Sequence, residues 1–281
     1  MAPWNDRLNV FVRRVGQPDS ESVRITSETE RSVAGYMWAD NERLLFMKDT
    51  AGDENYQLYG VRNDGSDLRA YTAFPGVRSS IIDDLEEQPG FVLIGMNQRN
   101  PEVFDPYRLN LETGELTLLA ENPGNIQGWM TDHNGALRVA TAIVDGVNTQ
   151  ILYRDSEDEP FRAVLTTNFR DLVGFMEFTP DNREVYAATN LNRDKTVLVR
   201  MNPATCEELE LLYENEDYDI ASISYSRKRE KVTECVLHGG TRNRFVTTLT
   251  RRRRRCAKES KRTFPTSVSG WLTRTRRRTF T

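Results

Sequence analysis

Apolar and polar residues alternate with a period of two along most of the first 230 positions, which predicts β-strands. Two runs, residues 43–47 and 91–96, are almost entirely apolar, as expected for strands covered on both faces. Two others, residues 116–119 and 209–213, mix polar positions in, as strands at the edge of a sheet do. No stretch of ten or more residues in this region has helical periodicity. The pattern therefore predicts an all-β protein.

The strands recur as a cassette of two strand pairs, repeated four times at a period of roughly 40 to 50 residues. The first pairs begin at Val33, Ser79, Ile126 and Leu172, and the second pairs begin at Tyr56, Tyr107, Ile151 and Val197. Residues that accept a positive φ or cap a tight reversal stand at the turns 63–65, 112–114, 133–135 and 180–182. Four strands per unit at this period are typical of β-propeller blades, because a sandwich would not repeat one cassette in register.

Each end of the chain carries part of a further blade. Residues 8–15 and 22–26 resemble the second half of a blade, and a fifth cassette that begins at Ile220 ends after about one strand pair. The sequence thus predicts about four complete four-stranded blades plus half-blades at both ends, in an open or incomplete ring. Propellers use roughly four to eight blades, so we expect this chain to be a piece of a larger ring.

The formal net charge of −4 hides a sharp division of charge along the chain. Residues 1–235 carry 24 Lys and Arg against 41 Asp and Glu, a net charge of −17. Residues 236–281 carry 14 Lys and Arg and one acid, Glu259, a net charge of +13. This division predicts a partial propeller over residues 1–235 and a basic, Arg- and Thr-rich tail over residues 236–281 that is aberrant or disordered.

Three interpretations of the tail compete. The arginines at 251–255 and 276–278 can neutralise phosphates as a nucleic-acid-binding arm, or they can form a nuclear-type targeting run. Alternatively, the segment is not a natural continuation of the propeller but an out-of-frame or truncated reading. We favour the third interpretation, because a genuine arm normally follows a completed domain and here the blade rhythm stops within a sheet. Nucleic acid is accordingly not an expected partner.

Other sequence features limit the compartment and the chemistry. The chain has no run of 18 apolar residues and no signal peptide after Met1, so we expect a cytoplasmic protein without a membrane span, or a periplasmic one if residues precede Met1. The three cysteines are widely spaced and odd in number, which favours free thiols over a disulfide framework or a metal site: Cys206, Cys235 and Cys256. No cofactor is predicted.

Several groups of residues resemble binding sites in part, but each favours a structural role. The acidic residues Asp49, Asp53 and Glu54 lack the order of a calcium loop, so a solvated turn is expected. The acidic run 83–87 can face a peptide amine, but a solvent-facing turn is favoured. Four aromatic residues at equivalent points are expected to wedge between adjacent blades: Trp38, Trp129, Phe175 and Phe178. Prolines fix a long loop whose two ends are Arg99, Asn100 and Pro101, and Asp105, Pro106 and Tyr107.

Long segments resemble the N-terminal propeller of bacterial prolyl oligopeptidase-family serine peptidases, a group that includes dipeptidyl and acylaminoacyl peptidases. The resemblance covers residues 4–232 and is carried by GYMWADNERLLFMKDTAGDENYQLYGVRNDGS, FMEFTPDNREVYAATNLNRDKTVLV and ISYSRKREKV. In that family the propeller caps an α/β-hydrolase domain and lets only short or unfolded peptides reach the catalytic serine. The resemblance therefore implies a propeller portion that precedes a catalytic domain.

The catalytic pattern of the family is not found in this sequence. The family's hydrolase domain carries a G-x-S-x-G elbow, and here the nearest match, residues 267–270, lacks the first glycine. Only two histidines occur: His133, expected to be an exposed turn residue, and His238, which falls in the basic tail. A catalytic triad needs a histidine positioned by an acid, so no catalytic residue is carried over.

The sequence thus predicts the non-catalytic propeller portion of a serine peptidase, which in the parent enzyme gates peptide access to the active site. The chain alone is not expected to be an enzyme. Its expected partners are peptides and the α/β-hydrolase domain, with self-association through unpaired half-blades. Two other classes remain open: a stand-alone TolB-like or WD-repeat-like propeller that binds proteins or peptides, and a nucleic-acid binder that uses the tail.

Overall fold

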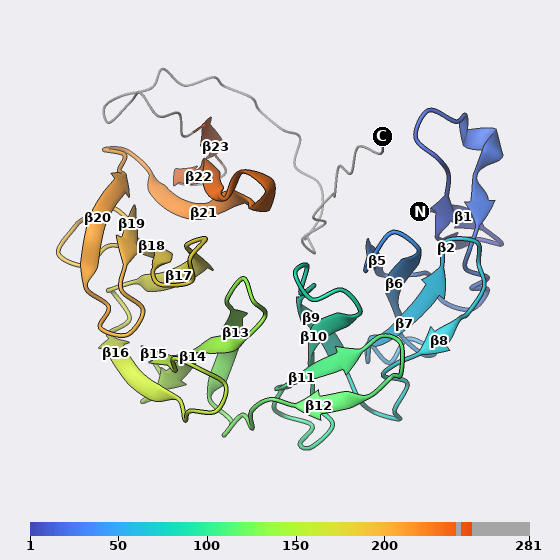
Figure 1. Cartoon of the computed structure of the whole chain (residues 1–281), viewed down its shortest axis with the longest axis horizontal. Coiled ribbons are helices and arrows are strands. Elements are labelled where there is room, and N and C mark those ends of the chain that lie inside the picture. Colours follow the sequence, from blue (N-terminus) through green and yellow to red (C-terminus); the bar gives the residue numbers. More distant parts are fainter. Residues whose placement is uncertain (240–242, 249–281) are drawn as a thin grey trace. The chain divides into compact units, whose positions relative to one another are not determined.

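The computed structural model describes residues 1–239 and 243–248, which form two compact units that meet in sequence at Gly124 and Asn125 (Figure 1). Every strand pair in both units is antiparallel. In the described part of the chain, the only helical elements are the 3-10 turns η1 (Asp19–Glu21) and η2 (Arg227–Arg229). The predicted all-β class is confirmed.

The first unit contains two four-stranded sheets in which the strands lie side by side in chain order. The first sheet consists of β5 (Gly35–Trp38), β6 (Arg43–Lys48), β7 (Gln57–Arg62) and β8 (Arg69–Ala70). The second consists of β9 (Ser79–Asp83), β10 (Phe91–Met96), β11 (Asp105–Asn110) and β12 (Leu116–Leu118). Their positions match the first two predicted blades.

The N-terminal half-blade is shorter than predicted and is accompanied by a separate hairpin. The half-blade is the pair β3 (Phe11–Val12) and β4 (Val23–Arg24), and the hairpin pairs β1 (Ala2–Trp4) with β2 (Arg7–Asn9). Between β1 and β2, Asn5 and Asp6 have φ values of 47° and 58°. Two successive positive φ angles suit the tightest hairpin turns, and Asn and Asp tolerate them well. This Asn-Asp signal was missed in the sequence.

The second unit contains the other two complete blades, again with strands in chain order. One sheet consists of β13 (Ile126–Thr131), β14 (Leu137–Val144), β15 (Asn148–Tyr153) and β16 (Arg162–Thr167). The next consists of β17 (Val173–Phe178), β18 (Val185–Thr189), β19 (Val197–Met201) and β20 (Glu208–Tyr213).

The four turns predicted from the sequence each contain a residue with positive φ. The φ values are 86° at Gly65, 78° at Gly114, 77° at Gly135 and 58° at Asn182.

The last sheet extends further than the sequence predicted. It has three strands, β21 (Asp219–Ser226), β22 (Lys231–Gly239) and β23 (Asn243–Thr248), where one strand pair was expected. The predicted boundary at residue 235 therefore falls inside β22, and His238 lies on a strand. The strand pattern of β22 is easily overlooked, because its buried residues Val232, Cys235, Val236 and Leu237 do not alternate regularly and the pairing with β21 shifts register. Residues 240–242 and 249–281 lie outside the described residues.

Adjacent sheets within each unit pack face to face through alternating residues of their central strands. On β6, Leu44 and Phe46 belong to a cluster shared with Val10 and Ile25, which flank the strands of the N-terminal half-blade. On the opposite face of the same strand, Leu45 packs with β9–β12 residues. The run 43–47 is thus covered on both faces, as predicted. The strands β12 and β20, by contrast, are largely exposed or half-buried.

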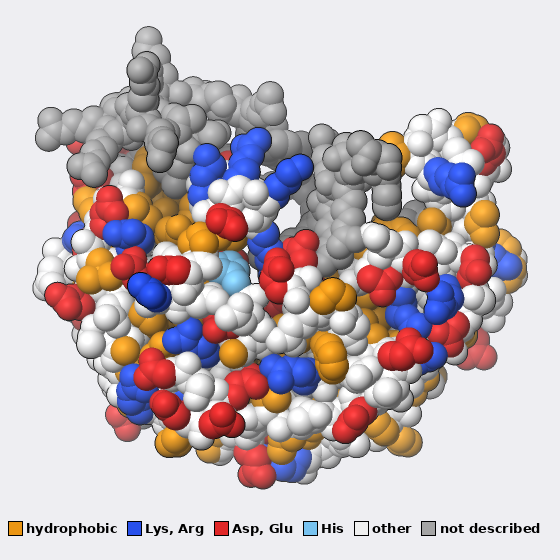
Figure 2. Space-filling model, in the orientation of Figure 1, with side chains coloured by type: hydrophobic (Ala, Val, Ile, Leu, Met, Phe, Trp, Pro, Cys, Tyr) orange, Lys and Arg blue, Asp and Glu red, His pale blue; other side chains and the backbone are white. Residues whose placement is uncertain are grey.

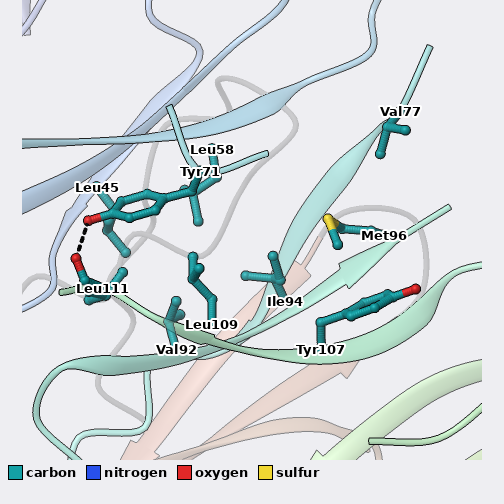
Figure 3. Close-up of a cluster of buried hydrophobic side chains, with 10 residues drawn as sticks. All are labelled: Leu45, Leu58, Tyr71, Val77, Val92, Ile94, Met96, Tyr107, Leu109 and Leu111. Carbon is teal, nitrogen blue, oxygen red and sulfur yellow. Dashed lines mark hydrogen bonds between the residues drawn. The ribbon is translucent and has the colours of Figure 1, made fainter. Parts of the chain in front are cut away.

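The second cluster of the first unit is drawn in Figure 3 and joins its two four-stranded sheets. Its buried residues are Leu45, Leu58, Tyr71, Val77, Val92, Ile94, Met96, Tyr107, Leu109 and Leu111. The hydroxyl of Tyr71 donates to the carbonyl oxygen of Leu111 at 2.7 Å (Figure 3). It also accepts from the guanidinium of Arg43 at 2.7 Å. One aromatic side chain therefore joins the two sheets by both packing and hydrogen bonding.

Gly60 on β7 makes room for this tyrosine, and we expect Gly60→Ala to destabilise the first unit. A Cβ at this position would lie 2.6 Å from Cε2 of Tyr71, closer than van der Waals contact allows. Tyr71 is 5% exposed, so its ring can move only by disturbing the cluster and the bond to Leu111. Overpacking of this kind costs about 1–3 kcal/mol in free energy of unfolding.

Denaturant unfolding followed by circular dichroism measures this loss, with Gly35→Ala as the matched control. Gly35 lies in the same sheet, and a Cβ there would meet nothing within 4 Å. The control should stay within about 0.5 kcal/mol of the parent chain. Equal effects of the two changes would show that the contact with Tyr71 is not the cause.

Candidate functional site

Of the acidic group predicted to lie in a solvated turn, Asp53 and Glu54 are exposed as expected, whereas Asp49 forms a buried ion pair. Both carboxylate oxygens of Asp49 accept from Arg31, at 2.9 and 3.0 Å, and the side chain of Asp49 is 2% exposed. The hydrogen bond from Arg31 lowers the pKa of Asp49, with a smaller contribution from the backbone N–H of Glu54. Asp53 caps its own turn by accepting from the N–H groups of Thr50 and Asn55. These contacts hold a loop in place and leave the carboxylate of Asp49 engaged.

The lowered pKa of Asp49 predicts a pH dependence of stability. A carboxyl whose pKa is lower in the folded chain stabilises the fold fully above its ordinary value of 3.8. That stabilisation is lost as the pH falls below this value and through the folded pKa. Asp49→Asn should therefore be less stable than the parent chain at pH 7, with a difference that shrinks on acidification below about pH 4. Urea midpoints from pH 7 to pH 2 measure it, and a constant difference over this range would contradict the assignment.

The long loop between β10 and β11 is held by a second buried carboxylate. The two oxygens of Asp105 accept from Nε and Nη2 of Arg99, both at 2.9 Å, and one also accepts from the N–H of Asn122 at 2.6 Å. Asp105 is 0% exposed. That prolines fix this loop stays a prediction, and Pro106 itself lies inside β11 opposite Gly95. The ion pair between the two ends of the loop was not foreseen.

A small polar cavity of about 230 Å³ opens beside Arg43 in the first unit. Its charged walls are already paired: the guanidinium of Arg43 bonds Asp67 at 2.9 Å, and Arg62 bonds Glu42 at 2.8 Å. The remaining lining residues are Asp40, Gly90, Leu111 and Glu112. The arrangement supports turn packing between the two sheets and presents no nucleophile.

A cavity of about 320 Å³ in the second unit is lined in part by Cys206. Burial raises the pKa of this thiol to about 11, so it is protonated at neutral pH and is a poor nucleophile. Beside it, Arg193 and Glu208 pair through two hydrogen bonds of 2.7 Å. Cys235 is buried on β22, and burial raises the pKa of its thiol to about 12. Both described cysteines are free, as predicted, and Cys256 lies outside the described residues.

His133 is more deeply involved in packing than the predicted exposed turn residue. Its backbone N–H donates to Asn182 Oδ1 at 2.9 Å, and its Nε2 lies 3.0 Å from the carbonyl oxygen of Phe178. The ring stacks on Tyr225 with centroids 5.2 Å apart. A histidine from one sheet thus contacts residues of the next two sheets in the second unit. The ring nitrogen faces a backbone carbonyl, so its role is to hold the turns together.

The predicted aromatic wedges are found between sheets in three of four cases. Trp38 packs against the cluster around β6, and Phe175 and Phe178 belong to the cluster between the two complete blades of the second unit. Trp129 differs, because its ring contacts Phe161 at a centroid distance of 5.8 Å within its own sheet's segment. In the run 83–87, Leu85 is 3% exposed and anchors the turn, which the sequence pattern did not indicate.

The turn between β21 and β22 is the one strongly basic turn of the described strands. It contains Arg227, Lys228 and Arg229 in η2, followed by Glu230 and Lys231. Lys228 and Arg229 are exposed. Figure 2 shows Lys and Arg side chains gathered over this turn. Because charge is concentrated on an ordered turn, this is the part of the described chain best suited to hold a ligand by charge.

The described residues contain neither a metal-binding cluster nor a membrane-spanning helix. No group of three or more His, Cys, Asp or Glu side chains suited to a metal ion occurs in residues 1–239 and 243–248. Over the same ranges, no helix is long and apolar enough to cross a membrane. The arginines at 251–255 and 276–278 and the segment 267–270 lie outside the described residues, so their predicted roles stay predictions.

Comparisons with known proteins show that this chain is similar to part of two dipeptidyl peptidases. Dipeptidyl aminopeptidase BIII from Pseudoxanthomonas mexicana is 28% identical over 206 residues, covering 70% of this chain and 29% of the relative. Dipeptidyl peptidase family member 6 from Caenorhabditis elegans is 25% identical over 247 residues, covering 83% of this chain and 32% of the relative. This chain thus spans about a third of the length of the relatives it matches. No family model matches the sequence.

Solved structures show the same fold. A prolyl endopeptidase from a study of two such enzymes matches with a TM-score of 0.53 and 15% identity, covering 82% of this chain and 35% of that one. TolB from Acinetobacter baumannii matches with a TM-score of 0.50 and 14% identity, covering 73% of this chain and 49% of that one. At these identities the structures support the propeller fold alone. The resemblance to the propeller of prolyl oligopeptidase-type peptidases is confirmed by the sequence match to the dipeptidyl peptidase relatives.

Proposed function

We propose that this chain is the propeller portion of a serine peptidase of the prolyl oligopeptidase family and that it admits short or extended peptides while it excludes folded proteins. The observation that carries the proposal is the sequence match to a dipeptidyl aminopeptidase over 70% of this chain. The described chain forms regular four-stranded blades, the architecture expected of a propeller cap over an active site. In this role the propeller contributes selection of the substrate by size, and the hydrolase domain contributes the chemistry.

The proposal is tested by comparing a free peptide with the same peptide held in a folded protein. Fluorescence anisotropy with the purified 281-residue chain measures binding of a labelled, uncharged octapeptide. The same octapeptide is then displayed in a loop of a stable folded domain. We expect the free peptide to bind at least about tenfold more tightly, a difference of roughly 1.4 kcal/mol. Equal binding would favour a stand-alone interaction propeller, and binding of neither would refute peptide admission.

The isolated chain should also hydrolyse neither dipeptide nitroanilides nor simple esters above the uncatalysed rate. Its sequence holds no G-x-S-x-G elbow, and Nε2 of His133 faces the carbonyl of Phe178. A fluorophosphonate probe gives an independent measurement, since it labels activated serines. Labelling that is abolished by one Ser→Ala substitution would overturn this expectation.

A further inference from the structure

The β21–β22 turn concentrates positive charge on a fixed backbone. Four of the five residues at 227–231 are Arg or Lys, and Glu230 is the exception. Glu230 closes η2 in the left-handed conformation, with φ of 49°, and its N–H donates to the carbonyl of Arg227 at 3.0 Å. The turn is therefore ordered before any ligand binds, which lowers the entropy cost of binding.

The base of this turn is anchored by aromatic packing. Tyr225, two residues before Arg227, stacks on His133 and lies 6.1 Å from the ring of Tyr186, centroid to centroid. Its strand partner Val232 is buried. Contacts from three sheets of the second unit thus meet beneath the basic turn, so its position relative to the neighbouring turns is fixed.

The neighbouring turns are much less positive. The β13–β14 turn contains Asp132 and His133, and the β17–β18 turn contains Asp181, Asn182 and the exposed Arg183. These turns lie on the same side of the second unit, because His133 bonds Asn182 and stacks on Tyr225. The positive charge is therefore concentrated on one turn. The adjacent β17–β18 turn adds a single exposed cation, Arg183.

We propose that the β21–β22 turn binds carboxylate groups of peptides, either a free C-terminus or acidic side chains. This inference rests on the proposed function of peptide admission and specifies which peptides are favoured. Arginine donates paired N–H groups that match a carboxylate, and lysine adds a mobile charge. The β21–β22 turn is short and includes the acidic residue Glu230. A second acid, Glu177, lies on the strand that leads to the adjacent turn. An extended polyanion needs a longer run of cations, so a peptide carboxylate fits better.

The experiment uses the full 281-residue chain and three labelled probes in anisotropy titrations. The first probe is an octapeptide of Ala and Gly with two Asp residues near a free C-terminus, and the second is an uncharged, amidated Ala-Gly octapeptide. The third is a thymidine oligonucleotide. The test variant is Lys228→Glu with Arg229→Glu. A second variant, Lys228→Gln with Arg229→Gln, removes the positive charges without reversing them and replaces the first if that one misfolds.

The matched control reverses two exposed arginines of the first unit, Arg14→Glu with Arg78→Glu, and so changes the net charge by the same amount. We expect the test variant to weaken binding of the acidic peptide about tenfold or more, the Gln variant to weaken it less, and the control to change it less than about twofold. Binding of the uncharged peptide should be unchanged.

Two results would overturn the proposal. Equal losses in the test and control variants, or no loss in either, would mean that the turn is an ordinary solvated turn. Tighter binding of the oligonucleotide that is lost in the test variant would identify a polyanion site instead. If the uncharged peptide still binds in either case, peptide admission stands while the carboxylate inference fails. If no peptide binds the parent chain, the proposed function itself fails.

Discussion

Phe178→Ala should lower the free energy of unfolding of the second unit by about 3–5 kcal/mol, the usual cost of deleting a fully buried aromatic side chain. Phe178 is 0% exposed and lies in the cluster between the two complete blades of this unit. The guanidinium of Arg138 also lies 5.0 Å from its ring centroid. Truncation would leave a cavity and remove a favourable site for that charge. Urea unfolding monitored by circular dichroism measures the loss.

The matched control is Phe169→Ala, the same chemical change at a side chain that is 73% exposed. It should change stability by less than about 0.5 kcal/mol. Phe178→Leu keeps most of the buried volume and should fall between the two. A small effect of Phe178→Ala would mean that the surrounding side chains collapse into the space, and that the cluster is less tightly packed than its burial indicates.

The strands of this protein were predictable because each is a local pattern. The unbroken apolar run Leu44, Leu45 and Phe46 encodes a strand buried on both faces. Gly65 and Asn182 mark turns that join neighbouring strands. The third strand of the last sheet was missed because its residues also carry the basic composition of the tail. The prediction for this segment followed its basic composition, although a strand pattern was also present.

The polar contacts were not predictable, because their partners are distant in sequence or fixed by the loop conformation. Asp49 resembled a solvated turn residue, and nothing local shows that Arg31, 18 residues earlier, folds back onto it. His133 likewise sits in a turn pattern, while its ring contacts come from Phe178 and Tyr225 on other sheets. The basic turn 227–231 was visible in the sequence, but only the structure shows that it is anchored beside two other turns.

The second large effect is expected at Asp105, where the Ala substitution should cost about 3 kcal/mol of stability in the first unit. The carboxylate is fully buried and accepts three hydrogen bonds, from Nε and Nη2 of Arg99 and from the N–H of Asn122. Its loss leaves a buried N–H without an acceptor. This cost is low for the loss of a partner from a buried ion pair, because Arg99 is 37% exposed and can turn toward water. Denaturant unfolding measures the cost.

A double-substitution cycle separates the ion pair from the rest of the site. Arg99→Ala leaves the fully buried carboxylate without its cation, so it should destabilise the chain at least as much as Asp105→Ala does. The double variant should cost clearly less than the sum of the two single variants, because neither residue is then left unpaired. Asp19→Ala serves as the control, since Asp19 also pairs with an arginine, at 3.1 Å, but is 93% exposed. Additive single effects would show that the loop is held by its prolines and backbone bonds, and that the charge pair contributes little.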